Sequence, residues 1–307
     1  MSKHDSYFDD DIDLKELFSV ILDSKKLIIQ ITLIFAVVSV ATSLSLTNYY
    51  KSEALLISRS NSENPLSQYS GLAAMAGVQI GSSTQDKTAQ IIELVKSRSF
   101  VQHLLTFENI LPSIMAPKSY DTETKELTFD RKLYDSETKS WKRKLGRNKS
   151  VIPSYIEVHE EYINNIMTVS QDSTNNFISL HVEHISPVFA KEFLDLVIRE
   201  ANELMRKKDM EDSRQGLEYL KSELSKTSFV EIQESINTLI EAQLETQMMT
   251  QINQDYILIE IDPPFIAEEK SKPSRALISI FGTILGAILS VSFVLINHYL
   301  LPQDKQI

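Results

Sequence analysis

The fold is decided by the passage Ile261-Asp-Pro-Pro-Phe-Ile-Ala-Glu-Glu-Lys-Ser-Lys-Pro-Ser-Arg275, which runs directly into an apolar segment from Ala276 to Ile296. This segment carries no charged side chain over about twenty residues. At about 1.5 Å of helical rise per residue, such a length matches a hydrocarbon core of about 30 Å. The sequence therefore predicts a transmembrane helix at 276–296, entered through a proline-containing segment.

Small residues recur inside this helix. Gly282, Gly286 and Ser290 are spaced four residues apart, which places them on one helix face. Small side chains in membranes allow a second helix to approach closely, so this face is predicted to pack against another membrane helix. Glycine is also common in membrane helices for other reasons, and the pattern alone leaves both explanations open.

A second apolar run, Leu27 to Leu46, also lacks charge and follows Lys25 and Lys26. It is too long for a signal-peptide core, and no small-residue cleavage site follows it. We interpret it as a retained membrane anchor. The predicted organisation is an N-terminal tail at 1–26, transmembrane helix 1 at 27–46, a large domain at 47–275, transmembrane helix 2 at 276–296 and a short C-terminal tail at 297–307.

Two spans place both termini on the same side of the membrane. Lys25 and Lys26 flank the first span, and the positive-inside rule assigns them to the cytoplasm. Lys270, Lys272 and Arg275 flank the second span on the opposite side, but the rule is weak for a loop as long as 47–275. We therefore expect cytoplasmic termini, with the large domain on the other side of the membrane.

The composition excludes several classes of protein. The chain has 31 basic and 42 acidic residues, and its net charge of −11 does not favour nucleic-acid binding. It contains no cysteine, which excludes disulfides, a thiolate nucleophile and a cysteine-based metal site.

The large domain divides into a base and an arm. Aromatic and apolar residues predict a strand at 49–58, and 256–261 is a candidate strand expected to lie beside it. Alternating residues predict a hairpin formed by 166–170 and 177–183. Residues 85–107 show helical spacing with a break near Ser97, Pro153 is expected to open a short helix, and 61–83 is predicted to be a loop or a short packed helix. The predicted α/β base comprises about 47–186 and 256–275.

The predicted arm covers about 187–255. Apolar residues recur at helical spacing there, and Gly216 is the only glycine between Pro187 and Asp255. The arm measures about 100 Å if unbroken, or about half of that if it folds back near Thr227, where Ser228 to Glu231 could form a capping box. A helix with such a stripe needs a packing partner, which favours self-association. The predicted fold class is α+β.

The sequence shows no recognisable catalytic motif. It lacks a phosphate-binding loop, a Gly-x-Ser-x-Gly elbow and a His-Glu-x-x-His pair. His181 and His184 would point to opposite faces of a strand, so they are not expected to share a metal ion. We predict no catalytic residue, no cofactor and no metal, and hence no enzyme.

A basic segment precedes the predicted hairpin. Arg131 to Lys149 carries eight basic and two acidic residues, with the only tryptophan, Trp141, among them. This composition could suit an anionic glycan, a lipid phosphate or a protein partner. A solvated hairpin anchored to the core by Trp141 is the better explanation of the segment.

Four motifs lie before the first span, in the first helical region, before the arm and around the second span: Asp11-Ile-Asp-Leu-Lys-Glu-Leu17, Leu94-Val-Lys-Ser-Arg-Ser-Phe100, Ser186-Pro-Val-Phe-Ala190 and Asp262-Pro-Pro264 through Lys272-Pro-Ser-Arg-Ala-Leu-Ile278. These motifs resemble those of the Wzz-type polysaccharide co-polymerases, the chain-length determinants of bacterial surface polysaccharides. The proline segment is the most specific of these motifs, although Ala267 stands where the family commonly has a further proline. Its residues of interest are Asp262, Pro263, Pro264, Pro273, Ser274 and Arg275.

The resemblance implies an inner-membrane protein with a periplasmic domain, assembled as a ring of identical subunits. It also implies work with a Wzy-type polymerase on an undecaprenyl-linked glycan such as O antigen, without a fused tyrosine kinase. Membrane lipid is then a further partner. Other interpretations remain open at this stage: a polysaccharide export adaptor, the membrane subunit of a sensor, or an enzyme acting on the glycan.

Overall fold

The computed structural model describes residues 14–58, 84–143, 150–172, 174–175, 177–252 and 256–300. Residues 1–13 and 301–307 of the tails, the predicted loop or helix at 61–83 and part of the basic segment lie outside the described residues. The chain forms two compact units. One consists of Met1–Asn48 with Lys272–Ile307, and the other is Tyr49–Ser271.

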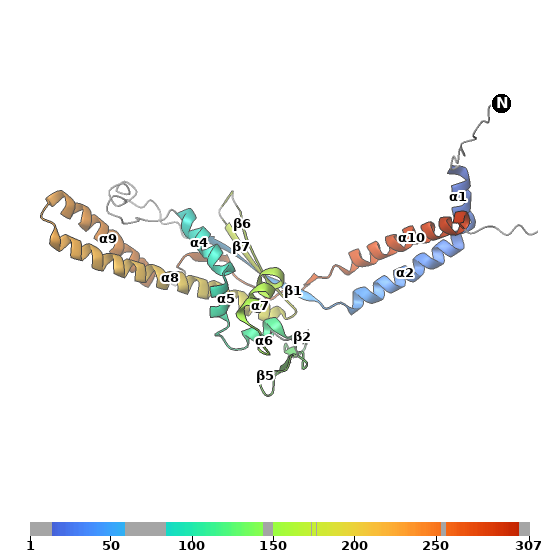
Figure 1. Ribbon diagram of the computed structural model, residues 1–307, viewed down its shortest axis with the longest axis horizontal. Helices are drawn as coiled ribbons and strands as arrows, with labels where there is room; N and C mark the ends of the chain where they lie inside the picture. Colours follow the sequence, from blue (N-terminus) through green and yellow to red (C-terminus); the bar gives the residue numbers. More distant parts are fainter. Residues whose placement is uncertain are drawn as a thin grey trace, which may run out of the picture. The chain divides into compact units, whose positions relative to one another are not determined.

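The first unit consists of three helices. The amphipathic α1 (Leu14–Asp23) breaks at Ser24 before α2 (Lys25–Ser45), and α10 (Arg275–Leu300) runs beside α2 (Figure 1). Both α2 and α10 are long and apolar enough to cross a membrane. Their outward side chains are apolar and exposed, as lipid-facing residues would be. The chain is thus a membrane protein with a central soluble unit.

The second unit is built on an antiparallel sheet. Its strands are β1 (Tyr49–Ser58), β6 (Met167–Gln171), β7 (Phe177–His184), β8 (Leu258–Asp262) and β9 (Lys270–Lys272). Their order is β6-β7-β1-β8, and β9 also pairs with β1. The predicted first strand, the hairpin and the return strand beside the first strand are confirmed.

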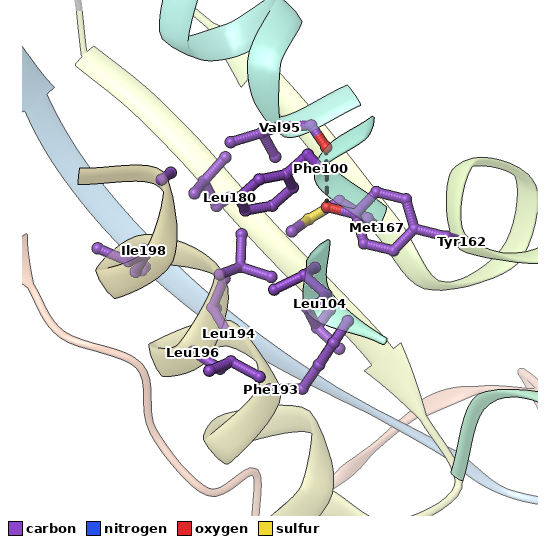
Figure 2. Packing of buried hydrophobic residues seen from close by; sticks show 14 of the residues in the cluster. Val95, Phe100, Leu104, Tyr162, Met167, Leu180, Phe193, Leu194, Leu196 and Ile198 are labelled. Atoms are coloured by element: carbon purple, nitrogen blue, oxygen red, sulfur yellow. Dashed lines mark hydrogen bonds between the residues drawn. The ribbon is translucent and has the colours of Figure 1, made fainter. Parts of the chain in front are cut away.

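Helices cover one face of this sheet. They are α4 (Thr84–Lys96), α5 (Arg98–Leu104), α6 (Ile110–Met115), α7 (Tyr155–Glu161) with its π-helical extension η2 (Tyr162–Ile166), and the start of α8 (Pro187–Lys226). Figure 2 shows the core where α5, α8 and β7 meet, with Phe100, Leu194 and Leu180 in the middle. The buried hydroxyl of Tyr162 donates to the Val95 carbonyl oxygen at 3.1 Å. That bond satisfies the one polar atom that the ring brings into the core.

Two small hairpins follow α6. They are β2 (Pro117–Tyr120) with β3 (Leu127–Phe129), and β4 (Tyr134–Asp135) with β5 (Ser140–Trp141). Trp141 packs on the buried Tyr134 with ring centroids 5.1 Å apart. The described part of the basic segment is therefore a hairpin anchored by its tryptophan.

The arm is a helical hairpin. α8 (Pro187–Lys226) and α9 (Val230–Ile252) lie side by side (Figure 1), joined by Thr227 to Phe229. The Ser186 hydroxyl caps α8 by accepting from the Phe189 N–H at 3.2 Å, and Pro187 occupies the first turn. Ser213 donates to the Gln243 carbonyl oxygen at 2.7 Å across the hairpin. Of the two arm geometries that the sequence allows, the structure has the folded one.

Two predicted helix starts are wrong. α9 begins at Val230, and the Phe229 carbonyl accepts its first helical bond from Gln233, so Ser228 lies outside the helix and forms no capping box with Glu231. Pro153 lies before α7 rather than in its first turn. The capping box there is formed by Ser154 and Glu157. The Ser154 hydroxyl precedes the helix and accepts from a free N–H group of the first turn, whereas a proline has no N–H group.

Candidate functional site

The glycines of α10 lie against α2. A Cβ atom added at Gly282 would lie 2.3 Å from the Ser39 Cβ, and one added at Gly286 would lie 2.4 Å from the Phe35 Cβ. Real Cβ contacts are not this short. At these two positions the backbones are therefore close enough that only glycine fits, which is the packing mode favoured between membrane helices.

Hydroxyl groups continue the same contact. Ser290 is fully buried, and its Oγ lies 3.3 Å from the Thr32 Oγ1 on α2. The Ser39 hydroxyl donates to the Ala36 carbonyl oxygen of its own helix at 3.0 Å, which satisfies it within the apolar contact. The structure thus brings Gly282, Gly286 and Ser290 together along one line of contact with α2.

The outer edge of this helix pair forms an apolar groove of about 400 Å³. Its walls come from both helices and contain two phenylalanines. The lining residues are Ile31, Phe35, Leu289, Ser292, Phe293 and Ile296. In a bilayer such a groove offers a surface for hydrocarbon chains.

The proline segment is distributed over both units. Asp262 ends β8, and Pro263 is exposed whereas Pro264 is buried. The Ser52 hydroxyl donates to the Phe265 carbonyl oxygen at 2.8 Å, and the Ser271 hydroxyl donates to the Tyr49 carbonyl oxygen at 3.1 Å. The segment from Asp262 to Ser271 therefore follows β1 back to its first residue.

The last residues of the proline segment, from Lys272 onward, belong to the unit that contains α2 and α10. Pro273 follows a cis peptide bond, and Ser274 offers its carbonyl oxygen to the Ile278 N–H in the first turn of α10. Arg275 donates to the Asn48 Oδ1 at 2.9 Å. This bond joins the first residue of α10 to a residue three positions after the end of α2, so the two membrane helices are linked at this end by a polar contact.

The root of the arm contains a polar clamp that sequence reasoning missed. Asn202 of α8 accepts from the N–H groups of Ile257 and Leu258 at 3.0 and 2.8 Å, and donates to the Leu258 carbonyl oxygen at 2.9 Å. One buried side chain thus satisfies three backbone groups. The signal available in the sequence was a single uncharged polar residue on the apolar face of a long helix.

A second cluster lies seven positions further along α8. The Asp209 Oδ2 accepts from the Lys87 ammonium at 2.8 Å and from the Tyr256 hydroxyl at 2.6 Å. Burial and the adjacent Asp209 carboxylate raise the pKa of Tyr256 well above its usual range, so the phenol stays protonated and keeps donating. Asn202 and Asp209 together hold 256–258, where the chain returns from the arm to the sheet.

Residues 10–106 match the family model described as Wzz, chain length determinant protein. The predicted resemblance is confirmed over this range. It covers about a third of the chain and includes α1, α2, β1, α4 and α5. The matched family consists of polysaccharide chain-length determinants.

Comparison with solved structures gives two similar proteins. A full-length bacterial polysaccharide co-polymerase is 10% identical, with 96% of this chain and 100% of that chain covered and a TM-score of 0.47. A fragment of WzzB, the polysaccharide co-polymerase from Salmonella Typhimurium, is 12% identical, with 73% and 100% covered and a TM-score of 0.34. A sequence comparison with curated proteins gave no match.

The two histidines of β7 have separate surroundings. His184 is buried, with its Nε2 at 2.9 Å from the Ser113 carbonyl oxygen and its Nδ1 accepting from the Ser186 N–H at 3.1 Å. His181 lies on the opposite face of the strand, with its Nδ1 at 3.8 Å from a Glu53 carboxylate oxygen. Within the described ranges, no group of three or more histidine and carboxylate side chains could hold a metal ion.

His184 should make the protein acid-sensitive. Burial lowers its pKa from 6.5 to about 4. As pH falls, His184 therefore binds its proton in the unfolded chain at a higher pH than in the folded chain. Its contribution to the free energy of unfolding is fully present above pH 6.5 and is lost as the pH falls below that value. The expected loss is about 2 kcal/mol by pH 5. Denaturant titrations of the full-length protein at pH 7 and pH 5 should show this loss, and His184→Asn should reduce it; an equal loss in the variant would contradict this prediction.

The described part of the basic segment is largely paired. Lys139 contacts Glu108 at 2.7 Å, Lys142 contacts Asp135 at 2.5 Å, and Arg143 contacts Glu157 at 2.6 Å. The hydrogen bond from Lys142 holds the pKa of Asp135 down at about 2. These three cations serve structural ion pairs, and the Arg143 pair is the most buried of them.

Proposed function

We propose that this chain regulates the length of a bacterial surface polysaccharide, without catalysing a reaction itself. The observation that carries the proposal is the match of residues 10–106 to the chain-length determinant family. Two helices able to cross a membrane, on either side of a sheet and a helical arm, agree with it. The protein would act through its shape and its assembly.

In this proposal the spans at 27–46 and 276–296 anchor the chain in the inner membrane. The domain at 47–275 lies in the periplasm, with the tails at 1–26 and 297–307 in the cytoplasm. Identical subunits form a ring that holds a Wzy-type polymerase and its undecaprenyl-linked glycan. Gly282, Gly286 and Ser290 keep the membrane helices packed. The proline segment (Asp262, Pro263, Pro264, Pro273, Ser274 and Arg275) stiffens the entry into the second span, since proline fixes φ near −65°.

The arm supports self-association in this scheme. Apolar side chains remain exposed along it after the two helices have packed against each other, at Phe229, Val230, Leu244 and Met248. A hairpin with apolar residues on its outside gains stability when a neighbouring copy covers them.

The function is tested by the size distribution of surface glycan in cells with and without this chain. Deletion should abolish the preferred length while polymer continues to form, because a regulator is removed and the polymerase remains. Expression of the intact chain from a plasmid should restore the preferred length. Loss of all polymer, or polymer that accumulates inside the cell with its lengths unchanged, would instead indicate synthesis or export.

A further inference from the structure

One side of α1 is apolar and exposed. Phe18 and Leu22 are 63% and 51% exposed, and they lie one helical turn apart on the same face. Leu17 and Ile21 lie beside them and are partly buried, whereas Asp23 is exposed on the polar side of the helix. A helix that is apolar on one side and polar on the other is typical of segments that lie along a membrane surface.

The position of α1 is fixed relative to the two membrane helices. It belongs to the same compact unit as α2 and α10 and packs against both of them, and its Val20 is buried. The Ser24 N–H donates to the Val20 carbonyl oxygen at 3.1 Å. The Ser24 carbonyl oxygen accepts from the N–H groups of Leu27 and Ile28 at 3.0 and 3.1 Å. Ser24 therefore closes the last turn of α1 and opens the first turn of α2, so the two helices are joined through a single hydrogen-bonded residue.

The chain changes direction at this residue. Ser24 has φ −91° and ψ 11°, which depart from helical values, and α1 bends away from the line of α2 there (Figure 1). Lys25 and Lys26 follow, both exposed, before the uncharged run 27–46. Lysines at the end of a membrane span lie at the level of the lipid headgroups, because their charge stays hydrated there. α1 therefore leaves the direction of the span at the headgroup level.

We propose that α1 lies in the headgroup layer of the bilayer, with Phe18 and Leu22 inserted at the boundary with the acyl chains. The exposed apolar side chains of α2 and α10 already face lipid, and α1 continues this surface without an intervening loop. Because α1 packs against both spans, its insertion would hold their ends together at a fixed depth. The inference requires only that α2 and α10 span a bilayer, and it is independent of the proposed function.

The absence of cysteine from the sequence allows a direct test. Phe18→Cys and Leu22→Cys, made separately in the full-length protein, are labelled with a polarity-sensitive fluorophore and reconstituted into vesicles of phosphatidylethanolamine and phosphatidylglycerol. Quenching is measured with lipids that carry a nitroxide near the top of the acyl chain, and separately with a water-soluble quencher present on both sides of the vesicle membrane. The matched control is Asp23→Cys, on the polar side of the same helix.

Lipid quenching at positions 18 and 22 should be several-fold stronger than at position 23, and the water-soluble quencher should show the reverse order. Equal lipid quenching at the three positions would overturn the proposal. Protection of 18 and 22 from the water-soluble quencher without lipid quenching would overturn it too, since a second copy or another protein would then cover the apolar side of α1. The glycan phenotype does not enter this measurement, so failure here and failure of the proposed function are distinguishable.

Discussion

Replacing Gly282 and Gly286 with leucine is expected to force α10 away from α2 and to change the glycan length distribution. The first added Cβ would lie 2.3 Å from the Ser39 Cβ, and the second 2.4 Å from the Phe35 Cβ. Both opposing atoms are bonded directly to the α2 backbone, so no side-chain rotation removes the clash and the helices must separate. Overpacking of this kind costs about 2 kcal/mol per site.

Two measurements separate the structural effect from the functional one. The pair Thr32→Cys and Ser290→Cys replaces hydroxyls whose oxygens lie 3.3 Å apart, and should form a disulfide when the helices are packed. In the leucine variant this cross-link should be lost, and a gel of surface glycan should show altered lengths at equal protein level. Ile288→Leu, at a lipid-facing position that is 58% exposed, is the control and should change neither.

Each possible failure of this experiment has a distinct meaning. An unchanged glycan ladder at equal protein level would remove Gly282 and Gly286 from the proposed function. An altered ladder with the cross-link intact would mean that these glycines act on a helix of another chain rather than on α2. Only the joint loss of the cross-link and of the preferred length supports the intramolecular contact as the active element.

The sheet could be predicted from the sequence because its signals are local. β1 alternates buried and less buried residues from Ser52 to Ser58, and the turn between β6 and β7 is rich in polar turn residues. The break between α4 and α5 was visible at Ser97, whose side chain caps α5. In each case the residues that determine the element lie within it or next to it.

The arm shows where local signals fail. Its reversal at Thr227 to Phe229 contains neither glycine nor proline, and Thr227 leaves the helix with φ −99° and ψ 140°, which any β-branched residue adopts readily. The reversal is therefore stabilised by packing between α8 and α9, including the bond from Ser213 to Gln243. A single sequence shows that each helix has an apolar stripe, but it does not show that the two stripes pack against each other.

The candidate site also contains some residues that local sequence signals identify and others that they do not. Gly282, Gly286 and Ser290 could be selected from their spacing alone, although the sequence does not identify α2 as the helix they contact. Asn202 and Asp209 could not be selected, because their partners at 256–258 are about fifty residues away in the chain. Contacts between residues so far apart in the chain produce no periodic pattern in the sequence.

Asn202→Ala is expected to destabilise the root of the arm by about 4 kcal/mol, since two N–H groups and one carbonyl oxygen would lose their partner in a buried place. The side chain is 5% exposed, so water does not replace these bonds without a rearrangement. Hydrogen exchange of the full-length protein in detergent should show faster exchange at the Ile257 and Leu258 amides. The overall unfolding midpoint in denaturant should fall as well.

Two further variants make this prediction specific. Asn202→Asp keeps an oxygen that can accept from both N–H groups but loses the donor to the Leu258 carbonyl, so its amide protection should lie between those of the alanine variant and the wild type. Asn237→Ala, at an exposed position of α9, should leave exchange at 257 and 258 unchanged. If Asn202→Ala also left amide exchange at 257 and 258 unchanged, residues 256–258 would be held by the apolar packing of Tyr256, Ile257 and Leu258 alone. The three hydrogen bonds of Asn202 would then contribute little to the position of the returning chain.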